Sequence, residues 1–400
     1  MTITALMPTF NRSPIAFERG EGVWLWTNNN EKYLDFGSGI ATNSLGHGNK
    51  HLVGAIAEQA AKVMHVSNLY SVPQASRLAE RLVGASFADS VFFCNSGAEA
   101  NEGLIKMVRR FQSDQGRPER YRMICFNGAF HGRSLATIAA TGNPAYLKGF
   151  GPVVEGFDHV EPNDLALVEA AITPETAGIL IEPVQGEGGI RVIPADFLQG
   201  LRYLCDKHGL VLAMDEVQTG AGRTGKMFAH QWTGVTPDIL SVAKGIGGGF
   251  PLGAILATES LAKPMVPGTH GTTYGGNPLA CTAGNAVLDV ILSDGFFDAV
   301  VAQSVHLRDG LEQVVRDFPQ LYSDVRGKGL LLGVKCIVSN ALVRNALLDQ
   351  RLLTVNAGDN VVRFVPPLIV SAEECSEAVE RFRKASKQLA QADCERKSVS

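Results

Sequence analysis

The sequence has no long uninterrupted apolar run. No stretch approaches the 18 apolar residues that a membrane-spanning helix needs. The first residues, MTITALMPTFNRS, also lack the basic start and long apolar stretch of a secretory signal. These absences predict a soluble cytoplasmic protein without a membrane span.

Charge of one sign is equally scarce. The formal net charge is -4, and charged residues make up 19% of the chain. We find no run of like charges except the short RFRK near residue 381. A mildly acidic chain of this kind has no general attraction to nucleic acid or to an anionic membrane, so neither is expected as a partner.

Cysteines are few and scattered. The seven cysteines lie at 94, 125, 205, 281, 336, 375 and 394, and no two form a CxxC pair. An odd number without such pairs predicts neither a disulfide framework nor a zinc site, and it fits a reducing compartment. No His pair has metal-ligand spacing, so no metal is expected.

What the chain does have is a large apolar content arranged in alternating elements. It has 400 residues, 45% of them hydrophobic, which suggests one large domain and a smaller one. Short apolar runs alternate with helical patterns between residues 51 and 280, which predicts an α/β fold with a mostly parallel central sheet flanked by helices. Residues 281–400 predict a smaller α+β domain, and residues 1–50 an N-terminal segment that packs with it. The expected strands of the large domain are 91–94, 121–125, 178–182, 209–214, 238–242 and 252–257.

Polar clusters follow the first two of these strands. NSGAEA (95–100) lies between a strand and a helix, where free backbone N–H groups and the helix dipole favour an anion such as phosphate. Ordinary capping by Asn95 or Ser96 explains this cluster as well. FHGR (130–133) offers an aromatic ring for a planar cofactor and an arginine for a carboxylate. A core Phe130 and a surface Arg133 are the alternative, and His131 is more often a packing residue than a catalyst.

Two further clusters carry groups that are costly to bury. Asp215 ends an apolar strand, so it needs a cationic partner such as a protonated pyridine nitrogen. A structural salt bridge or a helix cap is the alternative. Lys244 ends the run DILSV and is followed by crowded glycines. A desolvated lysine has a lowered pKa and becomes a nucleophile suited to Schiff-base formation, whereas a lysine reaching solvent would be inert.

One motif points to a different class of protein. Residues 220–226, GAGRTGK, match most of a phosphate-binding P-loop. The next residue is Met227, where the motif requires a Ser or Thr for Mg²⁺, and a thioether is a poor ligand for that cation. A P-loop nucleotide-binding protein is therefore the disfavoured alternative.

Taken together and in this order, the motifs resemble the ornithine/acetylornithine-type class III aminotransferases, which depend on pyridoxal 5'-phosphate (PLP) and have PLP fold type I. The matching segments run through most of the chain: 35–49 (DFGSGIATNSLGHGN), 93–102 (FCNSGAEANE), 130–134 (FHGRS), 182–189 (EPVQGEGG), 214–225 (MDEVQTGAGRTG), 241–249 (SVAKGIGGG), 271–280 (GTTYGGNPLA) and 360–369 (NVVRFVPPLI).

The resemblance implies a role for each site residue. Lys244 and Asp215 would be catalytic, with Lys244 holding PLP as a Schiff base and Asp215 pairing with the ring nitrogen. Arg133 and Thr272 would contact substrate, and Arg363, paired with Glu187 in alternation, would bind the α-carboxylate of glutamate or 2-oxoglutarate. The cofactor would be bound by Ser96, Gly97, Ala98, Phe130, Asp215, Glu216, Val217, Gln218, Lys244 and, from the partner subunit of a homodimer, Thr273.

The resemblance also implies an activity, the transamination of N2-acetyl-L-ornithine with 2-oxoglutarate in arginine biosynthesis. Succinylornithine, ornithine or 4-aminobutyrate is the alternative amino donor, because no motif marks an acyl pocket. The fold alone would also permit decarboxylation or aminomutase chemistry on the same cofactor.

Overall fold

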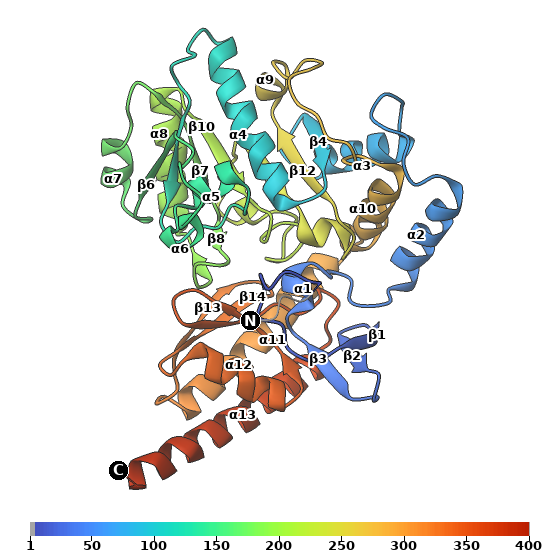
Figure 1. Cartoon of the computed structure of the whole chain (residues 1–400), viewed down its shortest axis with the longest axis vertical. Coiled ribbons are helices and arrows are strands. Elements are labelled where there is room, and N and C mark those ends of the chain that lie inside the picture. The colour runs from blue at the N-terminus through green and yellow to red at the C-terminus, as the bar shows by residue number, and fades with distance from the viewer. Residues whose placement is uncertain (1–4, 400) are drawn as a thin grey trace.

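The computed structural model describes residues 5–399, with side chains described to residue 392. A larger and a smaller body lie one above the other (Figure 1). The larger body is built on a seven-stranded sheet in the order β4-β12-β11-β10-β7-β5-β6. The strands are β4 (Ser90–Cys94), β5 (Arg122–Phe126), β6 (Phe157–Val160), β7 (Thr176–Ile181), β10 (Val211–Asp215), β11 (Ile239–Val242) and β12 (Gly253–Ala257).

The mostly parallel sheet that the sequence predicts is confirmed. Neighbouring pairs from β11 to β6 are parallel, and only β12 runs antiparallel to its neighbours β11 and β4. All five residues of β10 and all six of β7 are buried. Strands covered on both faces must be apolar on both faces, which is why these segments read as continuous apolar runs.

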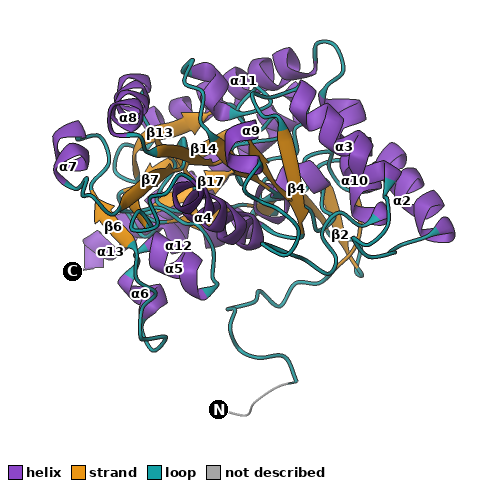
Figure 2. Cartoon of the chain, turned by 90° about the horizontal axis from the view of Figure 1, so that it is seen from above, coloured by secondary structure: helices purple, strands orange, loops and turns teal. Residues whose placement is uncertain are grey.

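Helices cover both faces of this sheet (Figure 2). Alternate residues of β10 point to opposite sides, so Leu212 and Met214 join one core cluster while Val211 and Ala213 join another. The first cluster is closed by α8 (Ala195–His208) and α10 (Pro278–Ile291), and the second by α4 (Gly97–Asp114). The start of α4 is thereby fixed against the carboxyl edge of the sheet.

The smaller body contains a four-stranded antiparallel sheet in the order β13-β14-β17-β16. Helices α11 (Phe296–Asp317), α12 (Asn340–Asp349) and α13 (Ala372–Val399) accompany it. The strands are β13 (Tyr322–Lys328), β14 (Leu331–Cys336), β16 (Val355–Ala357) and β17 (Val361–Phe364). The register of β14 and β17 places Arg363 opposite Gly333, in the middle of the sheet.

The N-terminal strands share a core with this smaller body. The strands β1 (Phe17–Glu21), β2 (Trp24–Thr27) and β3 (Lys32–Asp35) form a second sheet that ends on β15 (Leu352–Leu353). Leu34 and Phe36 are buried in the same cluster as Val300 and Phe364. The two ends of the described chain, before and after the large body, therefore pack together in one core.

The domain boundary placed at residue 280 needs correction. It falls inside α10, and this helix packs against α2 (Lys50–Lys62) and α3 (Pro73–Gly84) in the large-domain core. Its residues therefore belong with the larger body, and the boundary lies better between α10 and α11. The strands expected in the large domain also did not include β6, which lies at the edge of the central sheet.

Among the described residues, no helix is long and apolar enough to cross a membrane. Within the same part of the chain, six cysteines are unpaired and buried, and no group of three or more His, Cys, Asp or Glu side chains is placed to hold a metal ion. Cys394, the seventh cysteine, lies outside the described side chains.

Candidate active site

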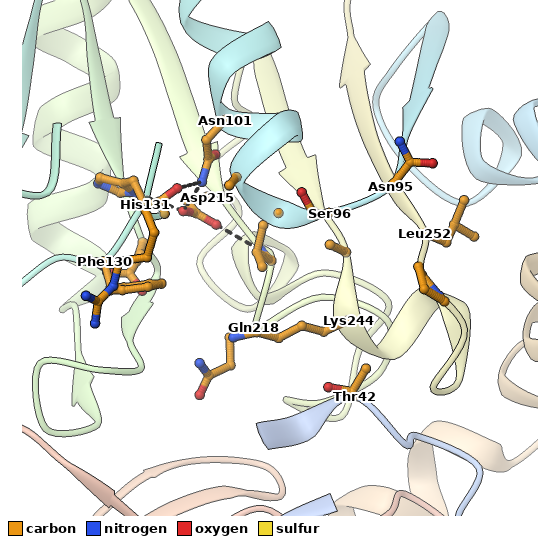
Figure 3. A pocket seen from close by; sticks show the side chains of 18 of the residues that line it. Thr42, Asn95, Ser96, Asn101, Phe130, His131, Asp215, Gln218, Lys244 and Leu252 are labelled. Atoms are coloured by element: carbon orange, nitrogen blue, oxygen red, sulfur yellow. Dashed lines mark hydrogen bonds and ion pairs between the residues drawn. The ribbon is translucent and has the colours of Figure 1, made fainter. Parts of the chain in front are cut away.

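A cavity of about 390 Å³ lies at the carboxyl ends of the parallel strands. Ligands of open α/β sheets bind at this edge because the loops after the strands leave a crevice there. The carboxyl ends of β4, β5, β7, β10 and β11, or the loops after them, each bring a polar group to the cavity. Figure 3 shows four of these side chains, Ser96, His131, Asp215 and Lys244, around the same space. The groups are Ser96, His131, Glu182, Asp215 and Lys244.

Lys244 lies at the floor of the cavity, directly after β11. Its backbone has a φ of 48°, in the left-handed region, and it begins the short 3₁₀ helix Lys244–Gly247. Desolvation lowers the pKa of its ammonium group, as does the charge of Arg363, while Glu187 opposes the shift. A lysine with a lowered pKa supplies more free amine near neutral pH, which is what nucleophilic attack on a carbonyl requires.

Asp215 is held in a dense hydrogen-bond network. Its Oδ2 accepts from Asn101 Nδ2 at 2.7 Å and from His131 Nδ1 at 2.8 Å, and its Oδ1 accepts from the backbone N–H of Val217 at 3.0 Å. Ser241 Oγ in turn donates to Asn101 Oδ1 at 2.6 Å. The carboxylate is only 3% exposed, so its position is fixed from several directions.

The second ring nitrogen of His131, Nε2, is buried and has no hydrogen-bond partner among the described residues. This favours the tautomer that carries its proton on Nδ1, because a bare nitrogen costs less to bury than an N–H without an acceptor. The sequence favoured a packing role for His131 and showed Asn101 only within the segment 93–102, without a role of its own. The only available signal was that Asn101 lies one helical turn after Gly97 in α4.

The start of α4 forms a concave cradle. Ser96 is the N-cap, and its Oγ accepts from the backbone N–H of Glu99 at 3.2 Å, so the capping interpretation holds while the residue also lines the cavity. A Cβ at Gly97 would lie only 2.6 Å from Val217 Cγ1. Glycine is therefore required for this close approach, which leaves backbone N–H groups at the positive end of an 18-residue helix.

Phe130 and Arg133 line one wall of the cavity. The guanidinium carbon of Arg133 lies 3.7 Å from the ring centre of Tyr146 and 5.6 Å from that of Phe130. Arg133 is exposed and has no carboxylate partner among the described residues, which leaves its donors available.

Glu182 is a functional candidate that the sequence reading quoted only within a motif. Its carboxylate is 5% exposed and accepts from the backbone N–H groups of Phe130 at 3.0 Å and Gly186 at 3.3 Å. Burial, together with the nearby charge of Asp215, raises its pKa well above the usual value. A protonated Glu182 would leave Asp215 as the anion in this part of the cavity.

Arg363 approaches from the smaller body. Its guanidinium is fully buried, and Nη1 donates to Glu187 Oε1 at 2.6 Å and to Gln218 Oε1 at 2.9 Å. Burial raises the pKa of Glu187, but the charge of Arg363 outweighs it and the net pKa is lowered. Nη2 has one long contact, 3.4 Å to the carbonyl of Asn356, so half of the guanidinium fork is weakly engaged.

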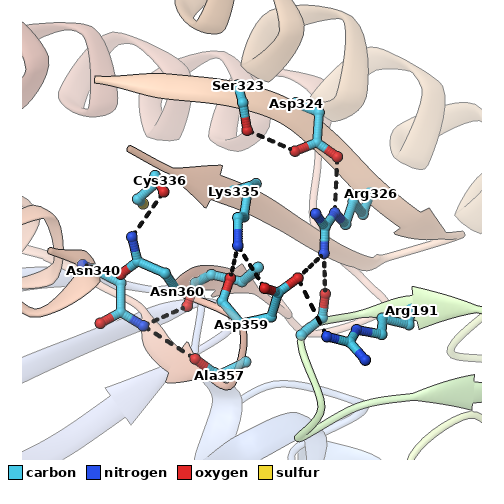
Figure 4. Close-up of polar contacts among 12 residues, drawn as sticks. Arg191, Ser323, Asp324, Arg326, Lys335, Cys336, Asn340, Ala357, Asp359 and Asn360 are labelled. Atoms are coloured by element: carbon cyan, nitrogen blue, oxygen red, sulfur yellow. Dashed lines mark hydrogen bonds and ion pairs between the residues drawn. The ribbon is translucent and has the colours of Figure 1, made fainter. Parts of the chain in front are cut away.

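Asp359 is the centre of an ion cluster (Figure 4). It contacts Lys335 and Arg326 at 2.6 Å and Arg191 at 3.6 Å, which joins the smaller body to the strand β9 (Arg191–Val192). The backbone N–H of Gly358 also donates to the carbonyl of Glu187 at 2.7 Å. Lys335, followed by Arg326, lowers the pKa of Asp359 to about 2.

Two expected site residues have different surroundings. Glu216 does not line the cavity: its carboxylate is fully buried and accepts from Thr219, Ala229 and His230. The expectation that Glu216 contacts the cofactor is therefore wrong. Asp215 and Glu216 are neighbours on an extended segment, so their side chains point to opposite sides.

Thr272 and Thr273 lie outside the main cavity, in a second hollow of about 420 Å³ that shares Asn95 and Ala98 with it. Within one chain neither threonine lines the cavity that contains Lys244.

The P-loop alternative finds no support in the geometry. The GAGRTGK segment is followed by the four-residue 3₁₀ helix Ala229–Trp232, where a P-loop is followed by an α-helix. Lys226 Nζ lies 4.4 Å from the ring centre of Trp232 and donates to the carbonyl of Gln231.

Comparison with known proteins assigns the family. A family model described as Aminotransferase class-III matches residues 8–386. The chain is 59% identical over 392 residues to the acetylornithine aminotransferase of Mesorhizobium japonicum, covering 98% of both chains. The chain therefore belongs to the class-III aminotransferases, as the sequence motifs predict, and it is an aminotransferase.

Solved structures agree with this assignment. The N-acetylornithine aminotransferase of Stenotrophomonas maltophilia is 38% identical, with a TM-score of 0.84 over 96% of this chain and 98% of the other. An ornithine aminotransferase of Toxoplasma gondii, with partial occupancy of PLP at its active site, is 28% identical with a TM-score of 0.91 over 96% and 92% of the two chains.

Proposed function

We propose that this protein transfers the terminal amino group of N2-acetyl-L-ornithine to 2-oxoglutarate, with PLP as cofactor. The observation that carries the proposal is the arrangement of two groups around one cavity. A lysine with a lowered pKa lies at its floor, and a buried carboxylate lies in the wall formed by the neighbouring strand β10. The names of the relatives described above support the choice of donor.

The residues present fit PLP. The cradle of Ser96, Gly97 and Ala98 suits a phosphate, because backbone donors and the helix dipole converge there. Asp215 receives only neutral donors from the protein, so its charge is available for a protonated ring nitrogen. Phe130 and Val217 line the faces between these two ends. When bound, PLP supplies a carbonyl that accepts an amino group and a ring that delocalises negative charge.

Each half-reaction needs a proton to leave the substrate carbon and return elsewhere. Lys244 Nζ is the group placed to carry it, because it is the amine at the cavity floor and its lowered pKa brings it toward the operating range of a general base. Asp215 would pair with the ring nitrogen of bound PLP, and its hydrogen bonds to Asn101, His131 and Val217 fix its orientation.

Two substrates of different shape must use this site in turn. Acetylornithine reacts at its terminal amine, so its α-carboxylate lies far from Lys244, where the exposed Arg133 offers a partner. Glutamate reacts at its α-amine, so its α-carboxylate lies close, where Arg363 would bind it after releasing Glu187. With Glu187 on Arg363, as observed, the positive charge is masked and the first substrate is favoured.

We further propose that the working unit is a homodimer. An apolar patch of Met64, Leu69, Tyr70 and Tyr274 is exposed, with Leu69 84% and Tyr274 62% accessible. Asn68 Nδ2 donates to the carbonyls of Thr272 and Gly275, which ties this patch to the hollow at Thr273. A second copy seated on the patch would bury it and bring Thr273 to the phosphate cradle of its partner.

The test is a donor panel with the purified protein. With 2-oxoglutarate as acceptor, we expect acetylornithine to give the highest kcat/KM among acetylornithine, succinylornithine, ornithine and 4-aminobutyrate. A visible absorbance band should accompany the activity. A higher kcat/KM for another donor would overturn the choice of substrate, and a colourless, inactive protein that PLP does not restore would overturn the cofactor as well.

Assembly is tested separately by light scattering. The wild-type protein should have the mass of a dimer, and Leu69→Asp should shift it toward the monomer and weaken phosphate binding, because a charge in an apolar interface is costly. A wild-type monomer with full activity would contradict the shared site.

A further inference from the structure

Arg223 is a buried cation without an anionic partner. The residue is only 2% exposed, and no carboxylate among the described residues pairs with its guanidinium. Desolvation alone lowers the pKa of its guanidinium to about 9. Placing a charge in such surroundings is expensive, so a purely structural site would more readily use an apolar side chain there.

What Arg223 contacts is the end of two strands of the smaller body. Its Nη1 donates to the carbonyl of Leu330 at 3.0 Å and to the carbonyl of Pro366 at 2.5 Å. Leu330 directly precedes β14, and Pro366 lies two residues beyond the end of β17. The backbone N–H of Leu330 also donates back to the carbonyl of Arg223 at 3.0 Å.

The loop that carries Arg223 is fitted tightly into the smaller body. A Cβ at Gly329 would lie 2.4 Å from the carbonyl carbon of Thr224. A Cβ at Gly222 would lie 3.1 Å from both Phe297 and Leu368. Both glycines also have positive φ, so other residues would strain the backbone as well as collide. The junction therefore admits little sliding between the two bodies.

The same loop contains two residues of the active site. It begins at Asp215, which ends β10, and Gln218 accepts from Arg363 Nη1 at 2.9 Å. Arg363 itself lies on β17, three residues before Pro366. One short segment of the large domain thus contacts the strand of Arg363 at two points, through Gln218 at its middle and through Arg223 beyond its end.

We propose that Arg223 is a positioning residue for Arg363, which it holds at a fixed distance from Lys244 by clamping the ends of β14 and β17 to the loop after β10. The proposal deepens the proposed function and rests on it, because Arg363 is there assigned to the α-carboxylate of the oxo acid. A guanidinium suits this task because its terminal nitrogen Nη1 carries two N–H donors, one for each carbonyl.

The test separates positioning from simple stability. The holoenzyme is titrated with glutarate, a dicarboxylate without a reactive group, by calorimetry, and the two half-reactions are measured separately. Arg223→Met should weaken glutarate binding and raise the KM for 2-oxoglutarate, each by about tenfold or more, since a displacement of about 1 Å is enough for such losses. The KM and single-turnover rate for the amino donor should change less than about twofold, because the carboxylate of that donor is assigned to Arg133 and not to Arg363.

Two further variants keep the result interpretable. Arg223→Lys should recover part of the glutarate affinity, because an ammonium group can still donate to the two carbonyls, and it serves if Arg223→Met does not fold. Val314→Ala, in the buried core of the smaller body on α11, should lower the melting temperature without changing glutarate binding. Unchanged glutarate affinity in Arg223→Met, or equal losses in both half-reactions, would overturn the proposal.

Failure of the proposed function would look different. If Arg363→Ala bound glutarate as tightly as the wild type, the assignment of Arg363 would be wrong whatever Arg223 does. If Arg363→Ala lost binding while both Arg223 variants kept it, only the clamp would be refuted.

Discussion

The two ends of the candidate site, Asp215 in the cavity wall and Arg363 behind Gln218, are held in opposite ways. Asp215 is held by Asn101, His131 and the backbone of Val217, all from the large domain and all with neutral donors. Arg363 comes from the smaller body and shares one nitrogen between Glu187 and Gln218, and the Glu187 side chain is 29% exposed. Several hydrogen bonds fix the carboxylate of Asp215 in one orientation. Arg363 instead pairs with Glu187, which a substrate carboxylate can replace. We infer that the proton transfer common to both half-reactions depends on Asp215, the fixed end of the site. The exchange of one substrate for the other depends on the Arg363–Glu187 pair, the adjustable end.

Lys244→Ala removes the amine that both half-reactions require, so it should have the largest effect on activity. Loss of the amine removes the point of covalent attachment and the proton carrier together, so we expect kcat to fall on the order of 10⁴-fold. The visible absorbance of the bound cofactor should change at the same time. A variant that keeps wild-type turnover and spectrum would show that the cavity works without this lysine.

Asp215→Asn tests the fixed end. It preserves the shape of the side chain but removes the charge, so both half-reactions should slow by on the order of 100-fold and to a similar extent. Stopped-flow measurement of each half-reaction provides the comparison. A loss confined to one half-reaction would mean that Asp215 is not part of the step common to both.

Glu187→Ala tests the adjustable end. It leaves Arg363 unmasked, which should favour glutamate and 2-oxoglutarate over the amino donor and change the ratio of the two half-reaction efficiencies by about tenfold, the worth of one charge-assisted hydrogen bond. The same stopped-flow assays measure it. Equal losses in both directions would argue against an exchangeable pair.

Asp359→Asn should have the smallest effect, on stability. The pKa of Asp359 is lowered to about 2, so the carboxylate stabilises the fold at pH values above its unfolded pKa, and this contribution is lost as the pH falls toward 2. Because the side chain is 27% exposed, we expect only about 1 kcal/mol at pH 7. Urea denaturation at pH 7 and pH 3 should show the difference from wild type shrinking at the lower pH.

The matched control is Asp324→Asn, which removes a more exposed carboxylate that pairs with Arg326 and accepts a hydrogen bond from Ser323 Oγ in the same cluster. It should cost less than Asp359→Asn at pH 7. An equal cost would mean that the bridging position of Asp359 between the two bodies adds nothing.

The sequence allowed the large-domain sheet and the groups at the strand ends to be predicted, because buried strands and costly buried charges leave local patterns. It did not reveal Asn101 or His131, since their importance arises from contacts with Asp215 that lie 114 and 84 positions away. Glu216 was misassigned for a related reason: adjacency to Asp215 in sequence does not place a side chain on the same side of the chain. The raised pKa of Glu182 depends on burial, which no motif displays.

The left-handed backbone of Lys244 has a consequence for how such a site persists. Its φ of 48° lies in a region that glycine adopts without strain. Any other side chain there lowers the stability of the fold by on the order of 1 kcal/mol. Glycine would relieve this strain, but it would also remove the amine that the chemistry requires. At this position a gain in stability and a loss of function would therefore come from the same substitution.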